Sequence, residues 1–152
     1  MYWTHWTRGD ISKGGTDGSN GKVILTGLVQ PCGIQYDYTS NRLYWAEEDG
    51  KKIQSSSSQG TNVRMHVKTS GRPYSMAVLN GRLYWGHYFS RPVESSTVAG
   101  QDIRTVYTAP SDVRQFHVPK WTRAASRMNH CELNNCSKVC ILTPTTARCL
   151  SG

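Results

Sequence analysis

The sequence predicts an all-β fold that is assembled from repeats of about 40 residues. The tetrapeptide Arg-Leu-Tyr-Trp occupies residues 42–45 and again residues 82–85. Tryptophans and glycines recur at the same two steps, of 42 and 40 residues, at Trp3, Trp45 and Trp85 and at Gly18, Gly60 and Gly100. A shared period of this size is typical of solenoids and of the blades of a propeller.

Each repeat is expected to contain four short strands. In the complete repeat, Gly-, Asn- and Ser-rich turns separate strands at residues 33–37, 42–46, 52–55 and 63–67. The next repeat follows the same course at residues 74–78, 82–86, 93–95 and 104–107. An Asn-Gly pair, which is a strong hairpin signal, separates its first two strands. Four strands in about 40 residues describe one propeller blade.

The two ends of the repeat region complement each other. Residues 2–4 have the pattern of a second strand, and residues 10–12 and 22–26 supply the third and fourth strands. Residues 110–116 resemble a first strand, and no Tyr-Trp strand follows them. We therefore expect about three blades' worth of strands in residues 1–119.

Composition sets the broad class of the protein. The chain has 152 residues, of which ten per cent are aromatic, mostly Tyr and Trp, and these suit half-buried strands. Its 18 basic and 10 acidic residues give a net charge of +8. The charge favours an anionic partner such as a sulfated glycan, although scattered basic residues are more simply a solvated surface. No nucleic-acid-binding motif accompanies the charge, and no apolar run reaches the ~20 residues of a membrane span.

Cysteines mark a second region. Residues 120–130 are expected to form a polar linker to residues 131–152. This last segment holds four of the five cysteines, which are Cys131, Cys136, Cys140 and Cys149. Because the segment has little apolar content for a core, it is expected to be a small disulfide-held unit in an oxidising, extracellular setting. Without a secretory signal at its start, we expect the chain to be part of something longer.

The repeated motif resembles the YWTD, or class B, repeats of the LDL-receptor family. The residues that carry this likeness, and that we expect to be structural, are Tyr2, Trp3, Arg42, Tyr44, Trp45, Arg82, Tyr84 and Trp85. Residues 16–20 and 31–34 also match the family's turn and first strand. The resemblance implies half of a six-bladed extracellular propeller followed by an EGF-like module. Such propellers bind protein ligands or take part in ligand release during endocytosis.

The aspartate that ends the family's motif is replaced in all three repeats, by His5, Glu47 and His87. In the family this aspartate ties neighbouring blades, so the substitutions put the rigidity of the blade interfaces in question. A histidine at this position would gain charge between neutral and endosomal pH. His5 and His87 are therefore candidate pH sensors of blade packing, with two solvent-facing polar residues as the simpler alternative. Their expected separation argues against a shared metal ion.

The resemblance also implies a disulfide pairing in the EGF-like segment. Cys131 would pair with Cys140 and Cys136 with Cys149, which is one of the three pairings that four cysteines permit. An EGF-like module has six cysteines, and Ser151 stands where the fifth would fall, so the unit is truncated. The acidic residues of calcium-binding EGF modules are absent before the first cysteine, and we expect no calcium site.

Three further features carry candidate chemistry. Arg8-Gly9-Asp10 is an integrin-type tripeptide in a predicted loop, for which an ordinary turn is the simpler interpretation. Cys32 is left without a partner and is expected to be a small buried residue between strands. Asn135 begins a formal glycosylation sequon whose middle residue is a cysteine. No nucleophile, base and orienting group converge in the sequence, so we expect neither an enzyme nor a cofactor or metal site.

The sequence therefore predicts a protein-ligand-binding module of an LDL-receptor-related receptor. Tyr88, Phe89 and Arg91 are expected to be exposed loop residues that face the ligand, because Tyr, Trp and Arg usually carry binding energy at interfaces. The alternative is a secreted matrix or adhesive protein that self-associates and binds an integrin through Arg8-Gly9-Asp10.

A propeller avoids exposed edges by closing its blades into a circle, so three blades alone would leave two apolar faces in water. Three arrangements would cover those faces. The chain can be part of a longer receptor, which is the arrangement we favour, or it can pair with a separate missing half. In the third, two copies exchange residues 110–116 and close one ring.

Overall fold

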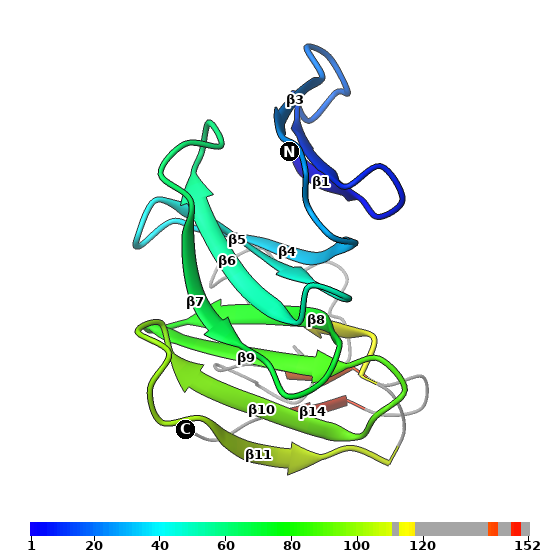
Figure 1. Cartoon of the computed structure of the whole chain (residues 1–152), viewed down its shortest axis with the longest axis vertical. Helices are drawn as coiled ribbons and strands as arrows, with labels where there is room; N and C mark the ends of the chain where they lie inside the picture. The colour runs from blue at the N-terminus through cyan, green and yellow to red at the C-terminus, as the bar shows by residue number, and fades with distance from the viewer. Residues whose placement is uncertain (111–112, 118–139, 143–146, 150–152) are drawn as a thin grey trace, which may run out of the picture.

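The computed structural model describes residues 1–110, 113–117, 140–142 and 147–149. All regular secondary structure in these residues is β-strand, and the strands form four antiparallel sheets (Figure 1). None of the described residues lies in a helix that is long and apolar enough to cross a membrane. The all-β prediction is confirmed.

Three of the sheets correspond to the sequence repeats. The first sheet has the order β1 (Tyr2–His5), β2 (Asp10–Lys13) and β3 (Lys22–Leu25). The second has the order β4 (Pro31–Asp37), β5 (Arg42–Glu47), β6 (Lys52–Ser57) and β7 (Arg64–Lys68). The third has the order β8 (Pro73–Leu79), β9 (Arg82–His87), β10 (Pro92–Thr97) and β11 (Arg104–Thr108). The predicted strands are all present, and each sheet is a simple up-and-down blade.

The fourth sheet joins the end of the repeat region to the cysteine-rich segment. It has the order β12 (Gln115–His117), β13 (Cys140–Leu142) and β14 (Ala147–Cys149). β12 lies in the segment that the sequence predicts to be a first strand, but its hydrogen-bonded neighbour is β13, with Phe116 opposite Ile141. β12 does not close the first sheet of its own chain, where β1 remains an edge strand.

The cysteine-rich segment is described only in its two strands. Their register places Cys140 opposite Cys149. The predicted linker at residues 120–130 lies outside the described residues, as do Cys131, Cys136, Asn135 and Ser151. The expected disulfide pairing and the EGF-like assignment therefore stay predictions.

The sheets stack face to face through apolar cores. Trp45 packs with Ile11 of the first sheet, and Trp85 packs with Tyr44 and Ile53 of the second. Both tryptophans are completely buried. The first strands of successive sheets also run side by side, because β4 contacts both β1 and β8 and β8 contacts β12 (Figure 1). Each repeat therefore buries its central tryptophan against the repeat before it.

A glycine in the turn between the third and fourth strands allows the sheets to approach closely. Gly60 and Gly100 both have positive φ, of 81° and 76°. A Cβ atom on Gly60 would collide with the carbonyl oxygen of Ile24, and one on Gly100 would collide with that of His66. In both cases the carbonyl belongs to the outermost strand of the preceding sheet, so the recurring glycine is required by packing as well as by backbone conformation.

Replacing Gly100 with Ala should destabilise the protein more than replacing Gly81 with Ala. Both glycines have positive φ, of 76° and 74°, so each variant places Ala in the left-handed region at a cost of about 1–2 kcal/mol. A Cβ on Gly81 meets nothing within 4 Å, whereas one on Gly100 displaces the β7 backbone. We expect Gly100→Ala to lose about 2 kcal/mol more of the free energy of unfolding in a urea titration. Equal losses in the two variants would contradict this packing role.

Candidate protein-binding face

The loops that connect second and third strands meet at one end of the stacked sheets. Trp6, in the loop of the first sheet, donates a hydrogen bond from its indole Nε1 to Oε2 of Glu48 at 2.8 Å. The Arg72 guanidinium lies 2.8 Å from Oε1 of Glu48 and 2.8 Å from Oδ1 of Asp49. Glu48 is buried, so these two partners compensate a charge that would otherwise be costly. The contacts link all three sheets at this end.

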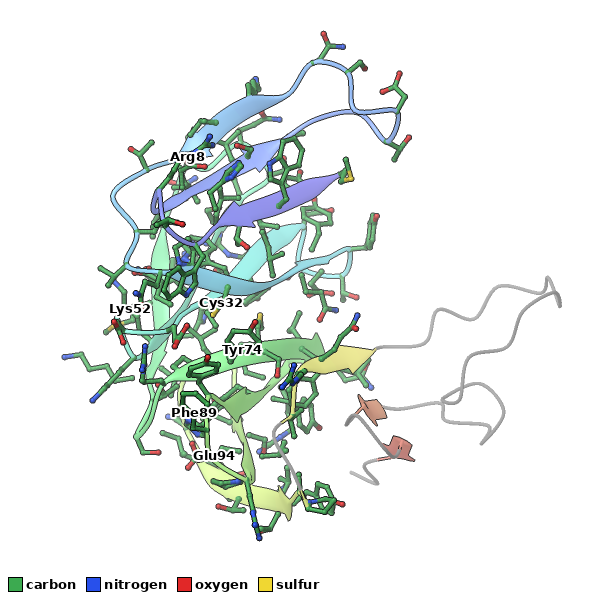
Figure 2. All side chains as sticks on the ribbon, turned by 90° about the vertical axis from the view of Figure 1, so that its right-hand side faces the viewer. Arg8, Cys32, Lys52, Tyr74, Phe89 and Glu94 are labelled. Atoms are coloured by element: carbon green, nitrogen blue, oxygen red, sulfur yellow. The ribbon has the colours of Figure 1, made fainter. Side chains whose placement is uncertain are left out.

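Aromatic side chains continue from this ion pair toward the third sheet. The ring centroids of Tyr74 and Tyr88 are 5.2 Å apart, and those of Tyr88 and Phe89 are 4.0 Å apart. The guanidinium carbon of Arg72 lies 5.5 Å from the centroid of Tyr88, within cation–π range. Figure 2 shows Tyr74 and Phe89 in the same part of the molecule. We call Trp6, Arg72, Tyr74, Tyr88 and Phe89 the aromatic face.

Phe89 is the most exposed member of this face. Its side chain is 74% exposed, and its backbone has φ of 56°. The left-handed region is unfavourable for a bulky residue, and an exposed aromatic side chain gains little from burial. Strain of this kind is found at functional sites more often than elsewhere. The loop after β9 therefore presents a large apolar side chain to solvent at a cost in stability.

A hollow of about 640 Å³ lies beside the aromatic face. Its walls come from β4, from β8 and from the described residues Arg114, Gln115 and Phe116 at β12, and four members of the aromatic face lie on its rim. The combination of an open hollow with Tyr, Trp and Arg side chains around it suits the insertion of a partner's side chain.

The sequence predicts part of this face correctly. Tyr88 and Phe89 lie on it, and Arg91 is exposed in the same loop. Whether these three residues contact a ligand stays a prediction. Trp6 and Glu48 were missed, although they occupy the same repeat position as Tyr88, at steps of 42 and 40 residues. That period is the signal that could have found them.

Glu47 takes over the role of the missing motif aspartate in the second repeat. It is fully buried, and its carboxylate accepts hydrogen bonds from the indole Nε1 of Trp45 at 3.3 Å and from the backbone N–H of Val29 at 2.8 Å. Lys52 lies 3.4 Å from the same carboxylate. Because Val29 lies in the segment that joins the first sheet to the second, this interface keeps a tie that the substitution had put in question.

Histidines hold the same position in the other two repeats. In the first, the indole N–H of Trp3 donates to Nε2 of His5 at 2.9 Å. In the third, Trp85 donates instead to Oε2 of Glu94 at 3.0 Å, and Nε2 of His87 lies 2.7 Å from that oxygen. His87 is buried, so it does not point at solvent. A role of His5 and His87 in pH sensing stays a prediction.

The integrin-type tripeptide is engaged within the chain. The guanidinium of Arg8 donates two hydrogen bonds to the Asp10 carboxylate, at 2.8 and 3.1 Å, and Asp10 is buried. Arg8 thereby lowers the pKa of the Asp10 carboxyl from its ordinary value. Gly9 has φ of 66° and lies against the carbonyl of Leu28. This geometry does not favour integrin recognition, which stays an untested prediction.

Cys32 lies between strands, as the sequence predicts. Its Sγ is 3.2 Å from the carbonyl oxygen of Pro73 and 3.5 Å from that of Ala46, so it bridges the second and third sheets. Burial raises the pKa of this thiol to about 12. No group of three or more His, Cys, Asp or Glu side chains in the described part of the chain could hold a metal ion.

His66 forms a link between the second and third sheets that the sequence does not predict. Its Nε2 lies 2.6 Å from Oγ of Ser55, and its Nδ1 lies 2.6 Å from the carbonyl oxygen of Val98 in the β10–β11 turn. Burial lowers the pKa of His66; the hydrogen bond to Val98 opposes this shift, and Arg42 and Arg64 add to it. The neutral imidazole is therefore the form that the folded interface favours.

Comparisons with known proteins agree with this architecture. The chain is 28% identical over 146 residues to the vitellogenin receptor of Solenopsis invicta, covering 93% of this chain and 8% of that receptor. It superposes on a chain of the nidogen/laminin complex with a TM-score of 0.73 and 19% identity, covering 93% of this chain and 51% of the other. A gluconolactonase from Xanthomonas campestris gives a TM-score of 0.57 at 17% identity, covering 71% and 37%. No protein-family model matches the sequence.

The stacked antiparallel sheets and these similarities define the chain as part of a β-propeller. Its repeats are LDL-receptor class B repeats, of the YWTD type, in which His or Glu replaces the final aspartate. The similarity to the vitellogenin receptor places this propeller segment with the LDL-receptor family, and the chain spans only a small part of that receptor's length.

Lowering the pH should destabilise the interface at His66. Because the pKa of His66 is lower in the folded protein than its model value of 6.5, the unfolded chain takes up the proton first. The stabilisation is complete above pH 6.5 and is lost as the pH falls below that value toward the folded-state pKa. We expect the fall in Tm between pH 7.5 and pH 5.0 to be smaller by a few degrees in His66→Gln than in the unmodified protein.

The double variant His5→Asn/His87→Asn is the matched control for this experiment. It tests the separate prediction that these two histidines sense pH, because a fall in Tm equal to that of the unmodified protein would end that idea. The same unchanged fall in His66→Gln would contradict the role assigned to His66.

Proposed function

We propose that this chain is a protein-binding module of an LDL-receptor-related extracellular receptor, and that the aromatic face is its contact surface. The observation that carries the proposal is the exposed, backbone-strained Phe89 beside Tyr88 and Arg72. A folded chain keeps such a costly arrangement where another molecule covers it.

The aromatic face has the properties of a preorganised binding surface. Arg72 is held by Glu48 and Asp49, so little side-chain freedom remains to be lost when a partner binds. Trp6 is 45% exposed although its indole N–H is fixed by Glu48. Trp, Tyr and Arg dominate the energetics of protein interfaces, and the adjacent hollow can accept a protruding side chain.

The names of the similar proteins support a protein partner. One is a receptor for vitellogenin, and the other was crystallised as a complex of nidogen with laminin. We extend this to a large extracellular protein ligand for the present chain, and ligand uptake by endocytosis follows as part of the same proposal. An anionic glycan remains a secondary expectation that rests on the net charge of +8.

A catalytic role is not part of the proposal. The likeness to the gluconolactonase has 17% identity and concerns the fold. Glu48, the buried carboxylate at the hollow, is already bound by Trp6 and Arg72, so it is poorly placed to act as a general base.

Binding can be tested with vitellogenin and with laminin as separate probes on the immobilised chain. We expect one of them to bind, and Phe89→Ala to raise its Kd at least tenfold, which corresponds to about 1.4 kcal/mol. Truncating a central aromatic side chain at an interface commonly costs this much or more. Biolayer interferometry gives both constants.

Met65→Ala is the matched control, because Met65 is 55% exposed on β7 and lies outside the aromatic face. It should leave the Kd unchanged. A Met65→Ala loss as large as that of Phe89→Ala, or the absence of binding to either probe, would contradict the proposed contact surface and its class of ligand.

A further inference from the structure

The first sheet differs from the other two in how its central tryptophan is covered. Trp45 and Trp85 are completely buried by the sheet that precedes each of them. Trp3 occupies the same repeat position but is only partly buried, because no described residue forms a preceding sheet. The first sheet therefore exposes a face that its two counterparts bury.

The recurring turn glycine gives an independent view of the same face. A Cβ on Gly60 or Gly100 would collide with a carbonyl oxygen of the preceding sheet, whereas one on Gly18 meets nothing within 4 Å. All three glycines have positive φ, of 83° for Gly18, 81° for Gly60 and 76° for Gly100. The turn at Gly18 thus has the shape of a contact surface whose partner surface is missing.

Backbone pairing shows a third difference at this face. The second strands β5 and β9 each pair with a first strand, β4 and β8, but β1 is an edge strand in its sheet. At the other end of the stack, β12 has one strand neighbour, β13, and its second edge is unpaired among the described strands. An unpaired edge is a template for another strand.

The third sheet carries the surfaces that the first sheet lacks. Val113 and Phe116 pack on it at Val93, as Met76 and Val78 of β8 pack on the second sheet. The β12 segment therefore already stands as the first strand of a following unit. That unit still needs a second, third and fourth strand, which are the strands that the first sheet supplies.

The contact for the turn glycine is also present. Ile24 and His66 provide the carbonyl oxygens that face Gly60 and Gly100, and Val106 of β11 is their repeat counterpart, at steps of 42 and 40 residues. No residue of the described structure covers Val106 as Gly60 covers Ile24. Each vacant half of a contact in the first sheet thus has its complement in the third sheet of the same sequence.

We propose that two copies of this chain form a closed pair, with the first sheet of each copy stacked on the third sheet of the other. In this pair β1 of one copy hydrogen-bonds along the free edge of β12 of its partner. Trp3 and Gly18 become buried, with Gly18 against the Val106 carbonyl. Because the two contacts are identical, a two-fold axis relates the copies and no sheet face remains open.

The size of the known relative fits two copies. The chain covers 51% of the nidogen chain on which it superposes, so two copies supply about what that single chain contains. The pairing also completes the hollow, because Thr4 and Trp6 of one copy would line it together with the Arg114 and Gln115 of its partner as well as its own. This inference is independent of the ligand proposed above.

Sedimentation velocity across a range of concentrations tests the pair with three proteins. The unmodified chain should sediment as a dimer. Gly18→Ala should raise the dimer dissociation constant at least tenfold, because its Cβ meets the partner's backbone. Gly81→Ala is the matched control: its φ of 74° gives the same backbone strain, its Cβ also meets nothing within 4 Å, and it lies in the β8–β9 hairpin outside the proposed contact. It should remain a dimer.

A second pair of variants keeps the test decisive if Gly18→Ala fails to fold. Trp3→Ser should weaken the dimer, whereas Trp6→Ser, on the aromatic face, should not, with folding of each checked by circular dichroism. An unmodified chain that is monomeric at all concentrations, an open-ended series of larger assemblies, or a dimer insensitive to both Gly18→Ala and Trp3→Ser would each overturn the proposal.

Discussion

Burial of one tryptophan between every two sheets is the constraint on which the rest of this structure depends. A single four-stranded sheet has two faces and cannot cover either by itself. Trp45 and Trp85 are each sealed by the preceding sheet, and an aromatic side chain of this size removes about 200 Å² from water, or about 5 kcal/mol of transfer free energy. Strand order, turn glycines and the side-by-side first strands all serve this stacking.

The buried indole N–H groups create a second requirement, because a buried donor without an acceptor is costly. The chain meets it with Nε2 of His5, the carboxylate of Glu47 and the carboxylate of Glu94. The buried carboxylates need donors in turn, which Val29 and His87 provide. The loops that follow these residues are thereby fixed at one end of the stack, and the aromatic face is built on them.

The periodic part of the structure could be predicted from the sequence. The steps of 42 and 40 residues locate the strands, and they also relate Trp6, Glu48 and Tyr88, which lie together on the binding face. What the period does not encode is which non-equivalent residues meet across an interface. The ion pairs of Arg72 and the transfer of the indole acceptor to Glu94 depend on side-chain reach between strands.

The pairing of β12 with β13 was missed for a related reason. These strands have three residues each and are separated by more than 20 residues in the chain. Strands this short leave no alternation from which a register can be derived, and the loop between them sets no fixed geometry. The sequence thus defines the blades well and their connection to the cysteine-rich segment poorly.

The stacking of the sheets is tested most directly at the tryptophans themselves. In protein labelled with 5-fluorotryptophan, the ¹⁹F signals can be assigned by replacing one tryptophan at a time with phenylalanine. Transfer from H₂O to D₂O should leave the signals of Trp45 and Trp85 unshifted and should shift that of Trp6, which is 45% exposed. A solvent shift at Trp45 or Trp85 equal to that at Trp6 would contradict the stacked arrangement.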